Sequence, residues 1–255
     1  MDGIININKP AGMSSFKCLS IVKRRLYDQL PEPKPKFKNW KIGHLGTLDP
    51  LASGVLVLLC GKATRMFDEL SGRGVSKRVC DSKVYRSVFT FGIETTTLDS
   101  EGEVTAASDI IPTRKQIEKI LSEMVGEIEI EVPKFSAVHI NGKRAYDLAR
   151  KGVEFTAPKR IVHIKRFELL ENIYAPNNST EFPSAIEGWR TEGATGCFEI
   201  ECQTGTYIRS LAKLMAQKLG TVAIASTIIR TRVGEFEIKD SKSLLEVTNC
   251  DILVL

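Results

Sequence analysis

The stretch KIGHLGTLDPLASGVLVLLCGKAT, residues 41–64, places a glycine-containing loop directly before the pattern of a buried strand. Gly43 and Gly46 permit a tight loop, and Pro50 pushes the backbone of Asp49 out of the helical region. We therefore expect the Asp49 carboxylate to project from a stiff turn at the mouth of the strand GVLVLL. Such a carboxylate can act as a nucleophile or general base. A turn aspartate that bonds its own backbone is the plainer alternative.

The composition is that of a packed globular protein. The 255 residues fit one large domain or one domain with a modest appendage, and 42% of them are hydrophobic. No signal peptide opens the chain and no apolar run approaches membrane-spanning length, so we expect a cytoplasmic protein. The six cysteines include no C-x-x-C pair, which argues against a metal site. Cys18, Cys60 and Cys202 fit buried thiols of a reducing compartment.

The charge distribution says more than the net charge. The 36 basic and 31 acidic residues give a net charge of +5, which is only a mild excess. Many basic residues gather in two bands, Lys23, Arg24, Arg25, Lys34, Lys36, Lys38 and Lys41, and Lys143, Arg144, Arg150, Lys151, Lys159, Arg160, Lys165 and Arg166. A solvated surface explains each residue singly. Two bands beside apolar elements suit a phosphate backbone better than a membrane.

The periodicity of the sequence predicts both strands and helices. Strand patterns occupy residues 3–8, 54–59, 84–92, 160–173 and 197–203. Helices are predicted after a cap at Ser15, over 112–128 and up to Gly220. Thr113 and Gln116 match a capping box, Thr206 can cap the last helix, and Asn141-Gly142 indicates a hairpin turn before a short basic helix. Without a regular βαβ repeat, this order indicates an α+β fold on one central sheet. Segments 30–39, 72–83 and 174–196 are predicted as surface connections.

Arg209 strengthens the functional interpretation of Asp49. It lies in the first helical turn after Gly205-Thr206, where the helix dipole favours an anion. A pair between Arg209 and the carboxylate would keep Asp49 ionised and hold it in place. Tyr85 and Tyr207 could provide ring faces for a flat substrate, although core packing is the simpler explanation for each alone.

Several motifs, in order over residues 1 to 236, resemble those of the TruB family of tRNA pseudouridine synthases. GIININKPAGMSS resembles the opening K-P-x-G-x-[ST]-S element, and GHLGTLDPLASGVLVLLCGKAT resembles the family's active-site motif. KVYRSVFTFG, ETTTLDSEG, FSAVHINGKRAYDLARKG, GTYIRSLA and IIRTRVGEF resemble the motifs that follow. The resemblance implies the pseudouridine synthase fold, with a mixed and largely antiparallel sheet flanked by helices and loops.

The resemblance also implies a reaction and a set of residues. The family isomerises uridine 55 in the T loop of tRNA to pseudouridine, without cofactor or metal. By position, Asp49 is the catalytic aspartate, Arg209 its ion-pair partner and Tyr85 the ring that stacks on the base. His44, Tyr207 and Ile228 match substrate-contacting positions, and Lys9 supports the active-site loop.

The resemblance further implies how the RNA is held. The target uridine must be flipped into a pocket before its C5 atom can react. A thumb-like segment at about 131–155 would grip the T stem-loop through shape and phosphates, with Lys143, Arg144, Arg150 and Lys151. We expect a monomer whose partner is tRNA, with a catalytic domain at 1–240 and a short tail at 241–255 without a full PUA domain. A tRNA-binding RNA chaperone of the same fold, and a synthase acting on T-loop-like hairpins of other RNAs, are the alternatives.

Overall fold

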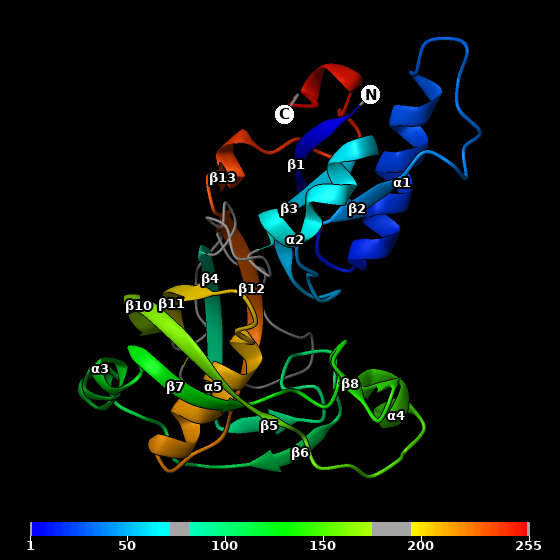
Figure 1. Cartoon of the computed structure of the whole chain (residues 1–255). Helices are drawn as coiled ribbons and strands as arrows, with labels where there is room; N and C mark the ends of the chain where they lie inside the picture. The colour runs from blue at the N-terminus through cyan, green and yellow to red at the C-terminus, as the bar shows by residue number, and fades with distance from the viewer. Residues whose placement is uncertain (1, 72–81, 175–194, 254–255) are drawn as a thin grey trace. The chain divides into compact units, whose positions relative to one another are not determined.

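The computed structural model describes residues 2–71, 82–174 and 195–253. Most of the predicted connections at 72–83 and 174–196, namely residues 72–81 and 175–194, lie outside these ranges, and the described ends of both segments belong to strands rather than connections. The chain divides into two compact units, residues 1–85 with 229–255, and residues 86–228. The chain passes from one unit to the other within two strands, β4 (Ser82–Phe91) and β12 (Ala223–Val233), both labelled in Figure 1.

The first unit contains both ends of the chain. Besides its parts of β4 and β12, its strands are β1 (Gly3–Lys9), β2 (Ile42–His44), β3 (Ser53–Cys60) and β13 (Phe236–Glu237). Its helices are α1 (Ser15–Asp28) and α2 (Phe67–Leu70), with 3-10 turns at Gly61–Met66, Ile238–Asp240 and Asn249–Asp251. β1 pairs antiparallel with β3, and β12 pairs parallel with β3, placing Arg230 opposite Gly54.

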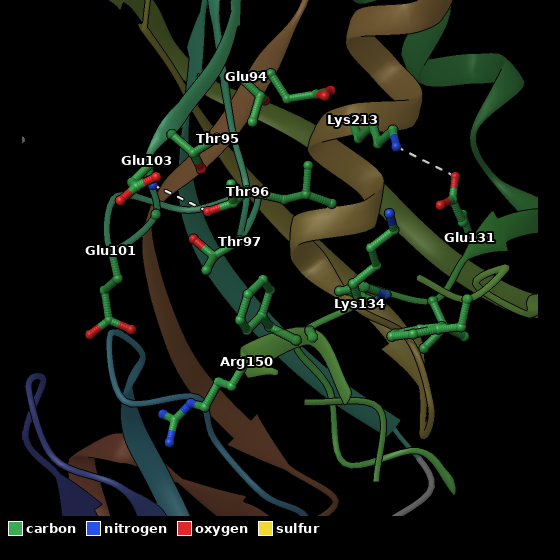
Figure 2. Close-up of a pocket in the computed structure, with 18 of the residues that line it drawn as sticks. Glu94, Thr95, Thr96, Thr97, Glu101, Glu103, Glu131, Lys134, Arg150 and Lys213 are labelled. Atoms are coloured by element: carbon green, nitrogen blue, oxygen red, sulfur yellow. Dashed lines mark hydrogen bonds and ion pairs between the residues drawn. The ribbon is translucent and has the colours of Figure 1, made fainter. Parts of the chain in front are cut away.

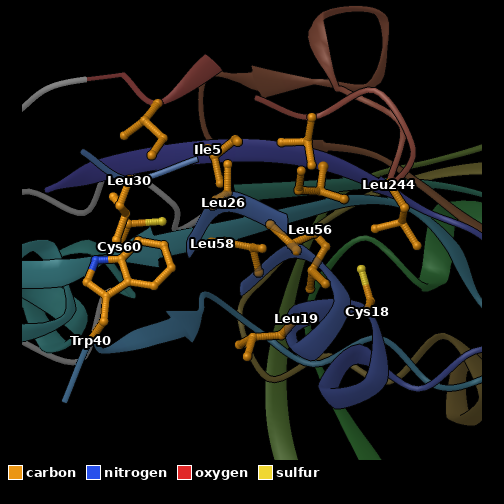
Figure 3. Close-up of a cluster of buried hydrophobic side chains, with 14 residues drawn as sticks. Ile5, Cys18, Leu19, Leu26, Leu30, Trp40, Leu56, Leu58, Cys60 and Leu244 are labelled. Atoms are coloured by element: carbon orange, nitrogen blue, oxygen red, sulfur yellow. The ribbon is translucent and has the colours of Figure 1, made fainter. Parts of the chain in front are cut away.

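Strand β3 is buried on both faces, as the run GVLVLL predicts. Successive side chains of a strand point to opposite faces, so its alternate residues enter two different cores. Leu56, Leu58 and Cys60 pack against α1 in one cluster, shown in Figure 3. Val55 and Val57 belong to the other cluster, together with residues that include Leu45, Leu70 and Phe236. The loop that carries Asp49 therefore leads into the best-packed strand of this unit.

Residues from the predicted tail pack into the same unit. Leu244, Val247 and Ile252 join the cluster formed by α1 and β3, and Leu244 is visible in Figure 3. The backbone of Leu253 bridges that of Ile4 in β1. Leu244, Val247 and Ile252 are thus part of the core of the first unit, whereas Leu253 is exposed.

The second unit is continuous in sequence. Besides its parts of β4 and β12, its strands are β5 (Ile93–Thr95), β6 (Val104–Ala107), β7 (Gly126–Glu131), β8 (His139–Ile140), β9 (Lys143–Arg144), β10 (Lys159–Tyr174) and β11 (Thr195–Gln203). Its helices are α3 (Arg114–Glu123), α4 (Ala145–Arg150) and α5 (Ile208–Lys218). β10 pairs antiparallel with both β11 and β7.

Hydrogen-bonded neighbours connect nine strands in one sheet. The order is β1-β3-β12-β4-β11-β10-β7, with β2 beside β3 and β13 beside β12. The pairs β1–β3, β10–β11 and β10–β7 are antiparallel, whereas β12–β3 is parallel. A mixed sheet with interspersed helices confirms the predicted α+β class.

Several local predictions are confirmed in detail. Thr113 and Gln116 form the capping box of α3. Asn141 and Gly142 make the turn between β8 and β9 with φ values of 50° and 79°, and the short helix α4 follows. That helix was predicted to be basic, but its sequence AYDLAR contains one arginine and one aspartate. The helix predicted over 112–128 is too long, however, because α3 ends at Glu123 and β7 begins at Gly126.

Two helix caps differ from the prediction. α1 is capped by Ser14, whose hydroxyl accepts a hydrogen bond from the Lys17 amide, because the neighbouring Ser15 hydroxyl is buried against Leu48. α5 starts at Ile208 with Tyr207 as its N-cap. The Thr206 hydroxyl donates instead to the Gln203 carbonyl, 2.8 Å away.

Candidate active site

In the first unit, the Asp49 loop is fastened on both sides of the aspartate. Leu45 and Leu48 are buried and hold the loop on the core, while Asp49 is half-buried and Pro50 is exposed. The Asp49 carbonyl accepts a hydrogen bond from the Ala52 amide at 3.1 Å, which closes the turn. Asp49 therefore lies half-buried in a turn closed by its own backbone, and the catalytic role of its carboxylate stays a prediction.

Lys9 supports this loop from beneath. The residue is completely buried at the end of β1. Its ammonium group donates to the carbonyls of Pro10 at 2.8 Å, Met13 at 2.6 Å and Pro50 at 3.3 Å. These bonds join the opening motif to the residue that follows Asp49. The prediction that Lys9 supports the active-site loop agrees with this geometry.

Ser15 adds a second link between the same segments. Its hydroxyl donates to the Leu48 carbonyl and accepts from the Leu48 amide, both at 2.8 Å. The Gly12 amide donates to the Pro50 carbonyl at 2.9 Å. The start of α1 and the Asp49 loop are therefore one hydrogen-bonded structure.

Arg230 secures the other end of the loop, a role that the sequence does not reveal. It is completely buried, and its guanidinium donates to the carbonyls of Val55 at 2.8 Å and Gly46 at 3.1 Å. Gly46 has φ +87°, and a Cβ there would lie 2.9 Å from the Lys83 ammonium nitrogen. Two buried cations thus lie beside Gly46, which must remain without a side chain.

His44 lies in β2, close to the same cations. Burial, and then the positive charge of Arg230, lowers the pKa of His44, while a backbone hydrogen bond opposes this shift. The imidazole is therefore neutral at neutral pH. A neutral ring can pack on a base or accept a hydrogen bond, which suits the predicted substrate contact. Tyr85, in the same unit, is 6% exposed on β4, so most of its ring is packed.

In the second unit, Arg209 is held by a buried network. It is 3% exposed in the first turn of α5, and its guanidinium donates to the carbonyls of Thr97 at 2.7 Å and Phe135 at 3.1 Å. Its Nη1 also lies 3.5 Å from Oδ2 of Asp99, which is equally buried. The predicted pair with Asp49 joins the two units and stays a prediction.

Asp99 is a residue of this site that the sequence analysis did not identify as a partner of Arg209. Its Oδ1 accepts hydrogen bonds from the Thr97 hydroxyl and from the Glu101 amide. The segment ETTTLDSEG carries this aspartate within a recognised motif, but nothing in the motif indicates a contact 110 residues away. Asp99 fixes the orientation of the Arg209 guanidinium.

The remaining predicted contacts of the second unit differ in exposure. Tyr207 is half-buried at the N-cap of α5, directly before Ile208 and Arg209. Ile228 is 4% exposed on β12. Tyr207 is therefore the more accessible of the two for a ligand.

A cavity of about 790 Å³ lies within the second unit, and Figure 2 shows residues that line it. Thr97 and Phe135, whose carbonyls bind Arg209, both line it. Its charged lining residues are Glu94, Glu101, Glu103, Glu131, Glu154, Lys134, Arg150 and Lys213. Three consecutive threonines, 95–97, also line it, and their hydroxyls are already hydrogen-bonded to Asp99 or Glu103. The cavity is therefore polar, and five carboxylates against three cations give its lining a net negative charge.

The predicted thumb borders this cavity. Lys143, Arg144, Arg150 and Lys151 are all exposed, and Arg150 lines the cavity. The guanidinium carbons of Arg144 and Arg150 lie 5.9 and 5.7 Å from the ring centroid of Tyr146. This arrangement presents several cations around one aromatic ring, which suits an RNA backbone.

Other kinds of site find little support in the part of the chain that the structure describes. Within residues 2–71, 82–174 and 195–253, no group of three His, Cys, Asp or Glu side chains could hold a metal ion. Every helix in these ranges is too short or too polar to cross a lipid bilayer. Cys18, Cys60 and Cys202 are buried thiols, as predicted.

Comparison with known proteins connects this geometry to a family. Residues 34–208 match the model described as "TruB family pseudouridylate synthase (N terminal domain)". The chain is 36% identical over 249 residues to tRNA pseudouridine synthase B of Bacillus cytotoxicus, which covers 97% of this chain and 71% of that protein. It is also 36% identical to tRNA pseudouridine synthase B of Geobacillus kaustophilus, with 97% and 76% coverage.

The fold of the chain also resembles that of solved structures. A chain in the structure titled "Crystal Structure of a Cbf5-Nop10-Gar1 Complex" superposes with a TM-score of 0.61 at 26% identity. The match covers 96% of this chain and 53% of that chain, so this protein spans about half the length of the solved one. A second structure, of an H/ACA RNP bound to a substrate RNA containing 2'-deoxyuridine, has a TM-score of 0.59 at 24% identity and supports the fold.

Proposed function

Because the chain belongs to the TruB family of pseudouridylate synthases, we propose that it isomerises a uridine of tRNA to pseudouridine, with Asp49 as the catalytic group. The proposed target is uridine 55 in the T loop, bound as part of the T stem-loop by one copy of the chain in the cytoplasm. The observation that carries the proposal is the immobilised Asp49 turn, which Lys9 and Ser15 fasten to the opening motif.

The rigidity of this turn suits the chemistry. The uridine must leave the base stack to reach the carboxylate, and unstacking costs a few kcal/mol. A carboxylate that is already positioned loses no further conformational freedom when the nucleotide arrives. Attack at C1′ or C6, or removal of the C2′ proton, would each loosen the glycosidic bond. Once the N1–C1′ bond has broken, the uracil turns and forms a C5–C1′ bond. C5 then gives up its proton and N1 takes one up, so the product is an isomer of the substrate.

The other residues take supporting roles in this proposal. Arg209, oriented by Asp99, would pair with the Asp49 carboxylate and keep it ionised. Tyr85 would stack on the uracil, while neutral His44, Tyr207 and Ile228 would contact the substrate. The exposed cations of the thumb, Lys143, Arg144, Arg150 and Lys151, would contact phosphates of the stem-loop.

The proposal is tested with purified protein and a tRNA transcript that contains uridine 55. We expect the wild type to form pseudouridine at that position and Asp49→Asn to form none. Binding by the variant should stay within about tenfold of the wild type, or about 1.4 kcal/mol. Asp109→Asn, which alters an exposed aspartate outside the cavity, is the matched control and should keep full activity.

Three outcomes would contradict the proposal. Substantial turnover by Asp49→Asn would remove the aspartate from its catalytic role. Pseudouridine found only in other hairpins would replace the substrate. Binding and refolding of tRNA without any pseudouridine would favour an RNA chaperone of the same fold.

A further inference from the structure

The net positive charge of the protein is concentrated in one short segment. Residues 15–41 contain eight basic and two acidic residues, a net charge of +6. The other 228 residues contain 28 basic and 29 acidic residues, a net charge of −1. The mild charge of the whole chain therefore hides one strongly positive segment, formed by α1 and the loop that follows it.

Four lysines of this segment lack acidic partners. Lys36, Lys38 and Lys41 are exposed, and Lys23 is partly exposed. Across residues 2–71, 82–174 and 195–253, no ion pair involves any of them, whereas Arg24 pairs with Asp28. We name these four lysines the basic α1 surface. Burial, and then the positive charge of Lys41, lowers the pKa of Lys23, so Lys41 lies within electrostatic range of Lys23.

Aromatic contacts hold the loop of this surface in place. Phe37 lies between Lys36 and Lys38 in sequence, and its ring centroid is 4.9 Å from that of Tyr27 in α1. The Lys23 ammonium lies 4.5 Å from the same Phe37 ring. The Tyr27 hydroxyl also donates to the Pro35 carbonyl at 2.7 Å. The lysines are thus carried by an ordered loop.

Trp40 anchors the far end of the loop. It is 5% exposed and lies in the cluster shown in Figure 3, with Leu26 and Leu30. A loop fixed at both ends by aromatic residues presents its cations at little cost in conformational entropy. The mutual repulsion of these lysines would then be relieved by a bound polyanion.

The burial of the apolar face of α1 favours a nucleic acid over a membrane as the partner of the basic α1 surface. Membrane-surface helices insert their apolar face among the lipids. Here that face is already used, because Cys18, Leu19, Val22 and Leu26 are buried in the core. Cations without an available apolar face suit a phosphate backbone.

The basic α1 surface also lies at a distance from the proposed site of chemistry. The first residue of α1, Ser15, bonds Leu48 in the Asp49 loop, whereas Phe37, the neighbour of Lys36 and Lys38 in sequence, contacts Tyr27 in the last turn of the helix. The 14 residues of α1 span about 20 Å at about 1.5 Å per residue. An RNA bound at both places would need to extend well beyond the reacting nucleotide.

We propose that the basic α1 surface binds the phosphate backbone of the substrate RNA at a point remote from the reacting uridine. It would add affinity without taking part in the chemistry. The inference rests on the proposed function, since it takes RNA as the polyanion. It concerns a loop that the predicted thumb does not include.

The test replaces three exposed lysines, Lys36→Gln, Lys38→Gln and Lys41→Gln, in one variant. Binding of whole tRNA is measured over a series of salt concentrations for this variant and the wild type. Each lost phosphate contact lowers the slope of log affinity against log salt by about 0.9. We expect the slope to fall by about two to three and the affinity at about 0.1 M salt to fall at least tenfold. Single-turnover rates at saturating enzyme should not change.

Two further variants make the result specific. The control variant removes three positive charges from exposed positions elsewhere, by Lys115→Gln, Lys119→Gln and Lys239→Gln. Its slope of log affinity against log salt should stay within about 0.5 of the wild-type slope. A third variant, with Lys36→Arg, Lys38→Arg and Lys41→Arg, keeps the positive charge. Its slope of log affinity against log salt should equal that of the wild type. Melting curves of all variants report on folding.

The inference is overturned if the glutamine variant and the control have equal slopes, or if the arginine variant loses as much affinity as the glutamine variant. Loss of binding to phosphatidylserine vesicles without loss of RNA binding would equally overturn it, in favour of a membrane. A wild type that binds tRNA through these lysines but forms no pseudouridine would refute the proposed function and keep this inference.

Discussion

Replacing Arg209 by lysine should damage both stability and catalysis. The Arg209 guanidinium satisfies two carbonyls, those of Thr97 and Phe135, and lies 3.5 Å from Asp99. A lysine ammonium lacks the planar fork and cannot keep this set of contacts. Each buried acceptor left unsatisfied costs about 1–3 kcal/mol. We therefore expect a loss of about 2 kcal/mol in the free energy of unfolding, which lowers the melting temperature by about 4–8 °C.

The catalytic effect has a separate cause. If the displaced cation no longer aligns Asp49, a misplacement of about 1 Å costs about a hundredfold in rate, or about 2.7 kcal/mol in activation free energy. Thermal melts and single-turnover rates at saturating enzyme measure the two effects on the same samples.

The control for Arg209→Lys is the same change at an exposed site. Arg166 on β10 forms ion pairs with Glu168 and Glu199 and is 40% exposed. Arg166→Lys should cost less than about 1 kcal/mol, because surface ion pairs contribute little. An Arg209→Lys variant that melts within 1 °C of the wild type and reacts at a near-normal rate would refute the reasoning.

Three other predictions follow from buried groups. The pKa of His44 is lowered in the folded state, so the unfolded chain binds a proton more readily below about pH 6.5. The free energy of unfolding should therefore decrease as the pH is lowered below this value, by up to about 1.4 kcal/mol per pH unit. Urea midpoints at pH 7.5 and 5.5 should therefore differ less for His44→Gln than for the wild type. Burial raises the pKa of the Cys18 thiol to about 11, so a maleimide at pH 8 should label exposed Cys250 and leave Cys18 unlabelled until unfolding, as read by peptide mass spectrometry. Gly54 has φ +100° and a Cβ there would lie 2.2 Å from a backbone oxygen of β12, so Gly54→Ala should cost about 3 kcal/mol or more in urea unfolding. Gly43→Ala, where a Cβ meets nothing within 4 Å, should cost less than about 0.5 kcal/mol, and equal costs at the two glycines would contradict this account.

The sequence correctly predicted features that depend only on residues close together in the chain. The Thr113–Gln116 capping box and the Asn141-Gly142 turn depend on residues only a few positions apart, and both were found as expected. The cap of α1 was wrong by one residue, since Ser14 and Ser15 have equal capping ability. A contact between Ser15 and Leu48, 33 residues away, decides which of them caps the helix.

In the candidate site, too, local sequence signals did not predict contacts between residues that are far apart in the chain. The rigid Asp49 turn could be predicted because a proline and two glycines act on their immediate neighbours. Asp99 and Arg230 could not be assigned, since their partners lie far along the chain. Composition makes a basic side chain a surface residue by default. Only the folded backbone, with carbonyls aimed at the guanidinium, explains the burial of Arg230.

The position of Arg230 in the chain has a consequence for biosynthesis. The Asp49 turn leaves the ribosome early, but the side chain that bonds Gly46 and Val55 is added about 180 residues later. At about 5–20 residues per second, that interval is about 10 to 40 s. The residues of the Arg209 network are all synthesised at least about 20 residues before Arg230. A nascent chain can therefore fold its Arg209 network while the aspartate turn is still incomplete, which delays catalytic competence until translation has passed β12.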